Sequence, residues 1–522
     1  MIPLPVLTAA QATRPASGGR QEPVDHAAAA ERFTADSART DWHDGALWHV
    51  REKRDRAVAR VPEWEALREA ASAIKEHALS HLADYLERFE AAATANGATV
   101  HWARDAEEHN RIVAGILAGA GATRLVKSKS MLTEECGLNP YLEARGVEVV
   151  DTDLGERIVQ LLDDEARAPE AGAGGASGDG APVRVAAHGG GPSHIVMPAI
   201  HLKKEEVGRL FEKRLGTERG NADPAYLTAR ARAHLRAHFL AADAALTGVN
   251  FAVAETGEVV VCTNEGNADL GVHLAPLQIH SMGIEKVVPR RADLGVFTRL
   301  LGRSATGQAV TVYTAHHRRP RPGTEMHVVI VDNGRTEQLG RGAFRGSLKC
   351  IRCGACMNTC PVYRRSGGHS YGSTVPGPIG SILTPGLDLR RYAALPFAST
   401  LCGSCTAVCP VKIDIDAQLY AWRQEVTAAG LAPRAKRAAM KASGAALGRP
   451  GLFARLGRTA RWALRRLPRA VTHARPNVWA QARDLPEPPP RSFREWVREN
   501  RPEAEARPPE ASGGGNASGA DA

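Results

Sequence analysis

Apolar residues recur at three- and four-residue steps in one stretch of the N-terminal part of the chain. The positions are Trp64, Leu67, Ala71, Ile74, Ala78, Leu82, Tyr85, Leu86 and Phe89. Because this spacing puts the apolar side chains on one face of a helix, it predicts an amphipathic helix or a helix pair between Val61 and Ala93. Residues 1–25 have no such period and are rich in Ala, Gly, Pro and polar residues, which predicts a disordered leader.

Short apolar runs alternate with helix-like segments between residues 110 and 334. After the helical NRIVAGILAGAG, the strand-like runs are TRLVKS, GVEVVDT, FAVAET, EVVVCTNEG, IHSMGIEKVV and EMHVVIVDNG. Apolar runs bounded by Gly, Asn or Pro are typical of buried strands. Their alternation with helical segments predicts an α/β layer with a parallel sheet.

Changes in composition predict the domain organisation. The Gly- and Ala-rich stretch from 164 to 191 predicts a flexible insertion rather than a boundary, because apolar segments resume after it. After Gly340 the connections become short and rich in Gly and Pro. We therefore expect an α/β domain over 26–340, a small, mainly α cysteine domain over 341–425, a basic helical extension over 426–484 and a disordered tail over 485–522.

The composition is that of a globular protein without an obvious membrane segment. Of the 522 residues, 43% are hydrophobic, which allows several domains with buried cores. No stretch of about 18 residues is apolar enough to cross a bilayer. The opening MIPLPVLTAA lacks the basic start and the continued apolar core of a signal peptide. We therefore expect a cytoplasmic protein.

Positive charge is concentrated near the C-terminal end. The chain has 67 Lys and Arg against 57 Asp and Glu, and no acidic residue occurs from Val426 to Arg483. Within 434–475 the cations mix with Leu452, Phe453, Leu456, Trp462, Leu464 and Leu467. A helix there would carry an apolar stripe beside a guanidinium-rich face. One interpretation is a solvated extension that packs on its own domain. The other is a surface that contacts an anionic membrane or an acidic partner subunit. The composition would also suit nucleic acid, but we do not expect nucleic acid as a partner.

Seven of the nine cysteines lie in two short runs. The first run, C-I-R-C-G-A-C-M-N-T-C-P, contains Cys350, Cys353, Cys356 and Cys360, and the second, L-C-G-S-C-T-A-V-C-P, contains Cys402, Cys405 and Cys409. A disulfide framework would need an oxidising compartment, so this grouping favours metal ligation. The first run has the spacing of bacterial ferredoxins, which predicts 4Fe-4S clusters. Cys136 and Cys262 stand apart, and we expect them to be buried core thiols.

The two runs predict two clusters with a crossed ligand set. In two-cluster ferredoxins the fourth cysteine of a run ligates the other cluster. Cluster one would then take Cys350, Cys353, Cys356 and Cys409, and cluster two would take Cys360, Cys402 and Cys405. The second cluster lacks one thiolate, because Ser399 occupies the aligned position.

Three explanations for the missing thiolate remain open. In the first, the second site holds a three-iron cluster. In the second, a non-cysteine ligand such as the Ser399 hydroxyl, a carboxylate or water completes a four-iron site. In the third, a partner subunit supplies the ligand. We favour an incomplete four-iron site. A zinc ribbon, which needs four thiolates from paired knuckles, fits seven cysteines with two C-P endings poorly.

Other polar groups are weaker candidates for a site. Lys127, Ser128, Lys129 and Ser130 directly follow a predicted strand, where a phosphate or carboxylate could bind. The turns at Glu255–Gly257 and Thr263–Asn267 could close a pocket, although ordinary turn chemistry explains them better. His101, His194 and His201 are isolated, and we expect none of them to bind a metal. No G-x-G-x-x-G follows a strand, so nothing favours bound NAD or FAD.

Seven stretches together resemble the lactate-utilisation protein B family of bacterial iron-sulfur proteins. In order along most of 60–420 they are KSKSMLTEECGLN, GVEVVDTDLGERIVQL, PSHIVMPAIH, ETGEVVVCTNEGN, GIEKVVP, CIRCGACMNTCPVYR and LCGSCTAVCPVKI. The resemblance implies an N-terminal lactate-utilisation-type domain, with an α/β fold similar to sugar-phosphate isomerases and CoA transferases. It also implies a two-cluster ferredoxin-like domain. The family has the same seven cysteines, whereas the insertion at 164–191 is longer than usual.

The resemblance implies an electron-carrying subunit of a complex that oxidises L-lactate to pyruvate. Two partner subunits are expected, one a cysteine-rich redox protein and the other with a related lactate-utilisation-type domain. The alternatives are a subunit of another 2-hydroxy-acid oxidase or quinone-linked complex, catalysis by the α/β domain itself, and a redox-sensing nucleic-acid-binding protein. The sequence shows no positioned nucleophile and base. We therefore expect an electron carrier rather than a catalyst alone, with contact at the inner face of the membrane as an alternative to a purely cytoplasmic location.

Overall fold

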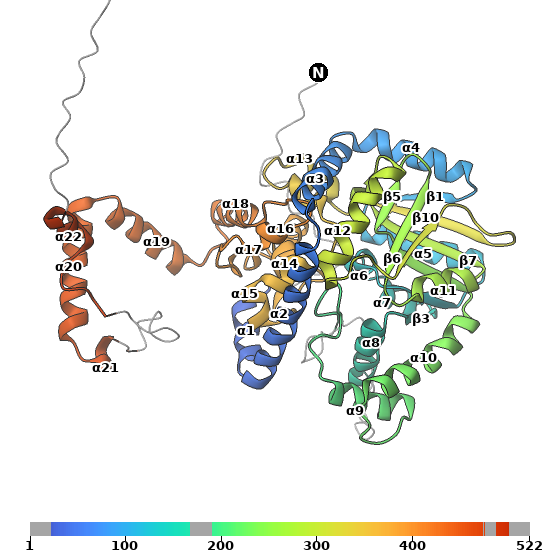
Figure 1. Ribbon diagram of the computed structural model, residues 1–522, viewed down its shortest axis with the longest axis horizontal. Coiled ribbons are helices and arrows are strands. Elements are labelled where there is room, and N and C mark those ends of the chain that lie inside the picture. Colours follow the sequence, from blue (N-terminus) through green and yellow to red (C-terminus); the bar gives the residue numbers. More distant parts are fainter. Residues whose placement is uncertain (1–21, 168–190, 473, 475–486, 501–522) are drawn as a thin grey trace, which may run out of the picture. The chain divides into compact units, whose positions relative to one another are not determined.

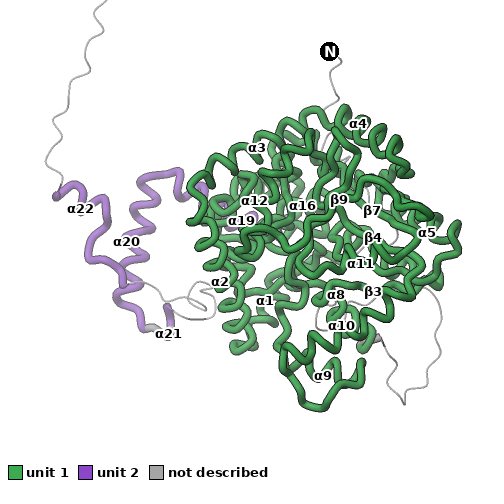
Figure 2. The backbone as a smooth tube through the Cα atoms, turned by 45° about the vertical axis from the view of Figure 1, so that its right-hand side comes forward, with its two compact units in different colours: residues 1–431 green, residues 432–522 purple. Residues whose placement is uncertain are grey.

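The computed structural model describes residues 22–167, 191–472, 474 and 487–500. Most of the predicted leader, most of the predicted insertion and part of the predicted tail lie outside the described residues. The chain divides into two compact units, the first ending at Leu431 and the second beginning at Ala432 (Figure 2). Each unit is described by itself.

A six-stranded parallel sheet lies in the first unit, as the apolar runs predicted (Figure 1). Its strand order is β1-β10-β7-β4-β2-β3. The strands are β1 (Thr99–Ala103), β2 (Arg124–Lys127), β3 (Glu148–Asp151), β4 (Ala244–Gly248), β7 (Leu277–Gly283) and β10 (Glu325–Val331). Helices cover both faces of the sheet, so its central strands are buried on both sides and are almost continuously apolar.

Two predicted strands do not belong to that sheet. β5 (Phe251–Val253) and β6 (Glu258–Thr263) pair antiparallel in a second sheet, whose order is β8-β5-β6-β9. It is completed by β8 (Val287–Val288) and β9 (Tyr313–His317). The turn between β5 and β6 is too short for the crossover that parallel strands need, so it joins antiparallel strands. Gly257 in this turn has a positive φ, and a Cβ there would collide with the backbone of Ala93.

The helices of the α/β part pack on the two faces of the parallel sheet. α5 and α7 cover one face, while α4, α10 and α11 cover the other. The predicted helix pair is confirmed as α3 and α4, which are separated at His81. The bounds are α3 (Trp64–Ser80), α4 (Leu82–Ala95), α5 (Ala106–Gly119), α6 (Met131–Glu135), α7 (Leu138–Glu143), α8 (Leu154–Arg167), α9 (Lys204–Leu215), α10 (Pro224–Ala241), α11 (Asn267–Leu274), η1 (Ile284–Lys286), η2 (Arg291–Asp293), α12 (Leu294–Thr306) and α13 (Arg335–Gly340).

The cysteine-rich part is a group of short helices that shares its core with the N-terminal helices. These N-terminal helices are α1 (His26–Thr34) and α2 (Ser37–Ala59). His43 Nδ1 of α2 lies 2.8 Å from the Arg364 carbonyl oxygen, and Arg54 donates to the Val408 carbonyl at 3.2 Å. The cysteine part consists of η3 (Arg345–Lys349), α14 (Ala355–Thr359), α15 (Pro361–Ser366), η4 (His369–Tyr371), α16 (Gly377–Leu387), η5 (Leu395–Phe397), α17 (Ser404–Val408) and α18 (Ile415–Ala428). Residue 340 therefore does not divide two compact units, and α1 and α2 pack with the cysteine part.

The segment from Gly191 to His201 connects the two parts of the first unit. The Tyr363 hydroxyl donates to the Ser193 carbonyl at 2.6 Å, and His194 Nε2 lies 3.0 Å from Asn358 Oδ1. A Cβ at Gly368 would collide with the Ser193 carbonyl oxygen, so the two backbones are in direct contact. Burial lowers the pKa of both His194 and His201 to about 3, and both rings have hydrogen-bonding partners in this segment.

The second unit is helical, as the basic segment predicted. It contains α19 (Arg434–Leu447), α20 (Pro450–Arg466), α21 (Arg469–Thr472) and α22 (Phe493–Asn500). The prediction of a disordered tail missed α22. Its signal was the S-x-x-E pattern of Ser492 and Glu495, whose side chains each accept a backbone N–H of the other residue. None of the helices in the described part of the chain combines the length and the apolar composition that a bilayer span needs.

The buried Lys127 at the end of β2 offers a test of the packing. Its ammonium group lies 2.6 Å from Glu134 Oε1 and 2.7 Å from Asp151 Oδ1. Lys127→Met would leave these carboxylates without their cation, so we expect the free energy of unfolding to fall by about 3–5 kcal/mol in urea titrations. Lys213→Met is the control, because Lys213 pairs with Glu165 at the surface and its loss should cost at most about 1 kcal/mol. Equal losses in the two variants would contradict this account.

Candidate iron-sulfur centre

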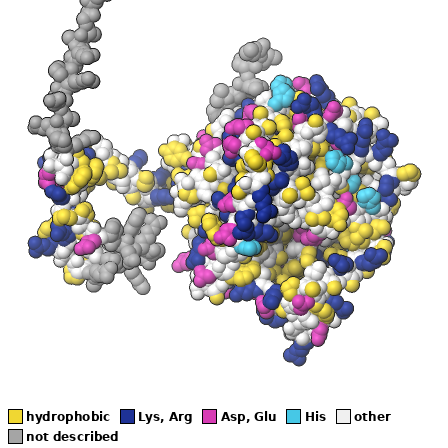
Figure 3. Space-filling model, viewed as in Figure 1, with side chains coloured by type: hydrophobic (Ala, Val, Ile, Leu, Met, Phe, Trp, Pro, Cys, Tyr) yellow, Lys and Arg dark blue, Asp and Glu magenta, His cyan; other side chains and the backbone are white. Residues whose placement is uncertain are grey.

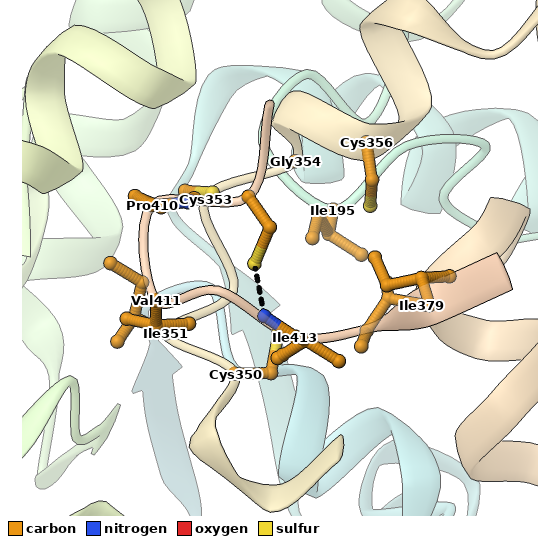
Figure 4. Close-up of a pocket in the computed structure, with 12 residues that line it drawn as sticks. Ile195, Cys350, Ile351, Cys353, Gly354, Cys356, Ile379, Pro410, Val411 and Ile413 are labelled. Carbon is orange, nitrogen blue, oxygen red and sulfur yellow. Dashed lines mark hydrogen bonds between the residues drawn. The ribbon is translucent and has the colours of Figure 1, made fainter. Parts of the chain in front are cut away.

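The backbone of the first cysteine run curls around a small pocket. Arg352 and Gly354 both have left-handed conformations, with φ of 59° and 76°, between η3 and α14. Gly354 lies against the ring of His194, where a Cβ would come within 3.1 Å of the ring. This curl directs Cys350, Cys353 and Cys356 to the same pocket (Figure 4).

The second run repeats this local geometry and adds a fourth thiol to the pocket. Leu401 and Gly403, which precede α17, have φ of 54° and 74°, and Cys409 follows the helix. Cys409 lines the pocket together with Cys350, Cys353 and Cys356. The Ile413 N–H donates to Cys409 Sγ at 3.4 Å, the contact drawn as a dashed line in Figure 4. The four residues that the crossed ligand set assigns to cluster one thus lie around one pocket.

The remaining three thiols lie near one another at the other ends of α14 and α17. Burial raises the pKa of the Cys405 thiol to about 12, and the nearby thiols of Cys360 and Cys402 raise it as well. Cys360 and Cys405 are buried, whereas Cys402 is exposed. The structure therefore brings together the three residues that the sequence assigned to cluster two, at a site closer to solvent.

Ser399 takes the same place in the second run that Cys350 takes in the first. The Leu401 N–H donates to Ser399 Oγ at 3.1 Å, and the Arg352 N–H donates to Cys350 Sγ at 3.4 Å. In both runs the donor N–H belongs to the residue two positions after the acceptor, and that residue has a left-handed backbone conformation. The hydroxyl therefore occupies the position in the backbone turn where the first run carries a ligand thiol.

The donor set fits iron-sulfur clusters. Burial raises the pKa of the thiols of Cys353, Cys356 and Cys409, so these groups persist as thiolates only beside compensating positive charge such as iron. No three His, Cys, Asp or Glu side chains among the described residues approach one another as ligands of a single metal ion do. The ligands of a four-iron cluster do not need to approach one another in this way, because each thiolate binds a different iron atom.

A group of buried charges lies beside the first pocket, and the sequence analysis missed it. Glu285 Oε2 accepts from Arg335 Nε at 2.8 Å, and Glu285 Oε1 lies 3.8 Å from the guanidinium of Arg352. Lys75 donates to the Glu285 carbonyl oxygen. Although burial raises the pKa of Glu285, the nearby cations lower it to about 2. The sequence feature that could have revealed this group is the interruption of the apolar run IHSMGIEKVV by Glu285 and Lys286.

A cavity of about 320 Å³ lies next to the cysteine pocket. The Ile195 side chain lines both spaces. The cavity is lined by Lys129 and Ser130 of the K-S-K-S motif and by the polar turn at 263–267, two features that the sequence had offered separately.

The other candidates lie elsewhere or have structural roles. Lys127 is held in its buried ion pairs, and Glu255 accepts from the Arg291 N–H at 2.8 Å. Cys136 is in the core, whereas Cys262 lines the larger cavity, and burial raises its pKa to about 11. His101 Nε2 lies 3.0 Å from Nδ1 of His327.

Comparisons with known proteins place three family domains along the chain. A LUD domain matches residues 86–337, a 4Fe-4S dicluster domain matches 346–413, and the C-terminal domain of lactate utilisation protein B matches 424–501. The dicluster match supports bound iron-sulfur clusters. It covers all seven cysteines of the two runs.

Curated relatives match nearly the whole chain. Lactate utilization protein B of Bacillus pumilus (strain SAFR-032) is 40% identical over 463 residues, which cover 87% of this chain and 92% of that protein. Lactate utilization protein B of Macrococcus caseolyticus is 39% identical, covering 86% and 91%. An uncharacterized electron transport protein of Escherichia coli (strain K12), YkgF, is 38% identical, covering 86% and 90%. A solved DUF162 family protein of Deinococcus radiodurans is 16% identical over 48% of this chain and 98% of that one, with a TM-score of only 0.24.

Removing one thiol tests the assignment of the first pocket. In Cys353→Ala we expect the bound iron to fall from about eight to about four atoms per chain, because one cluster loses a ligand. Iron and sulfide analysis of anaerobically purified protein measures this. Cys136→Ala is the matched control, since that thiol lies in the α/β core, and it should keep all the iron. Unchanged iron in Cys353→Ala would refute the assignment.

Proposed function

Because this chain belongs to the lactate utilisation protein B family, we propose that it is the electron-transfer subunit of a complex that oxidises L-lactate to pyruvate. The family and the 4Fe-4S dicluster domain give the chain an iron-sulfur role in lactate utilisation. The observation that supports electron transfer is the convergence of four thiols, from two separate runs, on one buried pocket.

The chemistry of lactate oxidation requires a carrier of single electrons. Conversion of the 2-hydroxyl to a 2-oxo group releases two electrons and two protons, whereas iron-sulfur clusters, when bound, take up and release one electron at a time. Two cluster sites that share α14 and α17 can receive such a pair. The protein holds the thiols in place and donates backbone N–H groups to three of their sulfur atoms, from Arg352 to Cys350, from Tyr363 to Cys360 and from Ile413 to Cys409. Such hydrogen bonds tune the potential of the bound group.

The proposed ligand sets follow the crossed arrangement. Cys350, Cys353, Cys356 and Cys409 hold the first cluster, and Cys360, Cys402 and Cys405 hold the second. We assign the remaining position of the second cluster to the Ser399 hydroxyl, because it occupies the turn position of Cys350. The second site would then be a four-iron site with three thiolates.

Two partner subunits complete the proposed complex, one a cysteine-rich redox protein and the other with a related lactate-utilisation-type domain. In the second unit, α20 exposes large apolar side chains among its arginines, including Phe453, Leu456 and Trp462. Figure 3 shows apolar and basic side chains next to one another on this unit. This surface suits an acidic partner subunit or an anionic membrane face.

The function is tested by adding L-lactate to the anaerobic complex that is captured through a tag on this chain. We expect electron paramagnetic resonance signals of reduced clusters, and we expect the first-cluster signal to be lost in Cys353→Ala and kept in Cys136→Ala. Glycolate and 2-hydroxybutyrate distinguish lactate from other 2-hydroxy acids. Clusters that stay oxidised with L-lactate, in a complex that retains its iron and partners, would refute the proposal.

The assignment of Ser399 is tested by Ser399→Cys. If a serine oxygen completes a four-iron site, this variant should keep the iron content and change the spectrum and the midpoint potential of the second cluster only, since thiolate replaces alkoxide. Thr400→Cys, one residue along the same loop, is the control and should leave both signals as they are. A three-iron signal in the native chain that becomes a four-iron signal in Ser399→Cys would exclude the serine ligand.

A further inference from the structure

The larger cavity lies where sheets of this kind bind small molecules. Its walls include residues that follow the carboxyl ends of β2 and β4 and residues at the end of β7, namely Lys129, Ser130, Val249, Asn250, Ser281 and Gly283. Ligands of parallel α/β sheets bind at this edge. The volume of about 320 Å³ falls within the usual range for ligand cavities.

One cation in this cavity, Lys286, has no carboxylate of the described residues within ion-pairing distance, and the Glu285 carboxylate acts on it only from farther away. The other cations have carboxylates beside them: Lys129 with Asp153 at 2.9 Å, Arg335 with Glu135 at 2.9 Å, and Arg352 with Glu285 at 3.8 Å. Among the residues that the structure describes, none forms a hydrogen bond or an ion pair with the ammonium group of Lys286. A cation removed from bulk water is stabilised by an anion, so Lys286 marks a place for one negative charge.

The rest of the lining suits an organic monoanion. The carboxylates of Asp153, Glu265 and Glu285 also line the cavity, and they would repel a doubly charged phosphate. Val249, Val261 and Leu301 provide an apolar wall for a carbon chain.

The cavity is also adjacent to the first cluster site. Only the side chain of Ile195 is shared between the two spaces. Arg352 lines the cavity, and its backbone N–H donates to the Cys350 sulfur at 3.4 Å. A molecule bound in the cavity therefore lies beside the thiolates through which electrons would leave.

We infer that this cavity, next to the first cluster site, binds a small 2-hydroxy or 2-oxo monocarboxylate whose carboxylate pairs with Lys286. The identity of the acid rests on the proposed function, whereas the place for a single carboxylate comes from Lys286 in the cavity. The volume also accommodates acids longer than three carbons, so the site selects the functional group more strictly than the chain length.

The experiment is calorimetric titration of the anaerobic, iron-loaded full chain with L-lactate, pyruvate, 2-hydroxybutyrate, acetate and inorganic phosphate. The 2-hydroxy and 2-oxo acids should bind and should perturb the paramagnetic signal of the reduced first cluster. Acetate should bind at least several-fold more weakly, because it lacks the 2-oxygen, which can bond to polar groups of the lining. Phosphate binding as tightly as lactate would overturn the ligand class.

Variants test the role of Lys286. Lys286→Met should weaken lactate binding by about tenfold or more, and Lys286→Arg should restore most of it. Lys213→Met, at the surface, is the control and should bind as the native chain does. If Lys286 serves only to balance the charge of the cluster, Lys286→Met will shift the midpoint potential and leave lactate affinity unchanged, which overturns the inference.

Two further outcomes keep the test decisive. Should Lys286→Met lose its iron or its fold, Lys286→Gln decides the question, because it removes the charge and keeps a polar side chain: a several-fold loss of affinity supports the inference, and native affinity overturns it. If no acid binds the native chain while L-lactate still reduces the clusters of the whole complex, the site lies on a partner subunit. In that case the inference fails and the proposed function stands.

Discussion

The carboxylate of Glu285 is the contact on which the arrangement of the first unit depends. It follows β7 at the centre of the parallel sheet, and the groups around it come from three other segments: Lys75 of α3, Arg335 of α13 and Arg352 of the first cysteine run. A buried carboxylate is tolerable only when cations and hydrogen-bond donors surround it. Each of these segments is therefore held in position by the same residue, Lys75 through the backbone carbonyl and the two arginines through the carboxylate, and the cysteine run is fixed to the edge of the sheet.

The local parts of this structure were predictable, because they depend on residues that are close in sequence. The spacing of the cysteines dictated which thiols could face one cluster, and the two runs have matching backbone conformations at Arg352 and Leu401. The parallel sheet was predictable for a similar reason, since strands buried on both faces are uniformly apolar. The alignment of Ser399 with Cys350 is also a local feature, because Ser399 keeps the backbone turn of Cys350.

The long-range arrangement was not predictable from these patterns. α2 has no apolar stripe, and three of its four buried residues are polar, so its sequence does not show that it packs against the cysteine part. The cavity is assembled from Lys129, Thr263, Lys286 and Arg352, which no periodicity connects. The sequence suggested the K-S-K-S motif and the turn at 263–267 as separate weak candidates, and it indicated no role for Lys286. Only the topology of the sheet, with β4 and β7 between β10 and β2, brings these positions to one edge.

The close contact between Gly368 and Ser193 bears on the maturation of the protein. Because the segment that carries Ser193 also provides Ile195 to both the cysteine pocket and the larger cavity, the two spaces have a common wall. The thiols that we propose as ligands of the first cluster lie on one side of that wall, and the proposed organic site lies on the other. A cluster bound by those thiols would therefore also support one wall of the organic site. Under this proposal, the supply of iron limits binding of the small molecule as well as electron transfer.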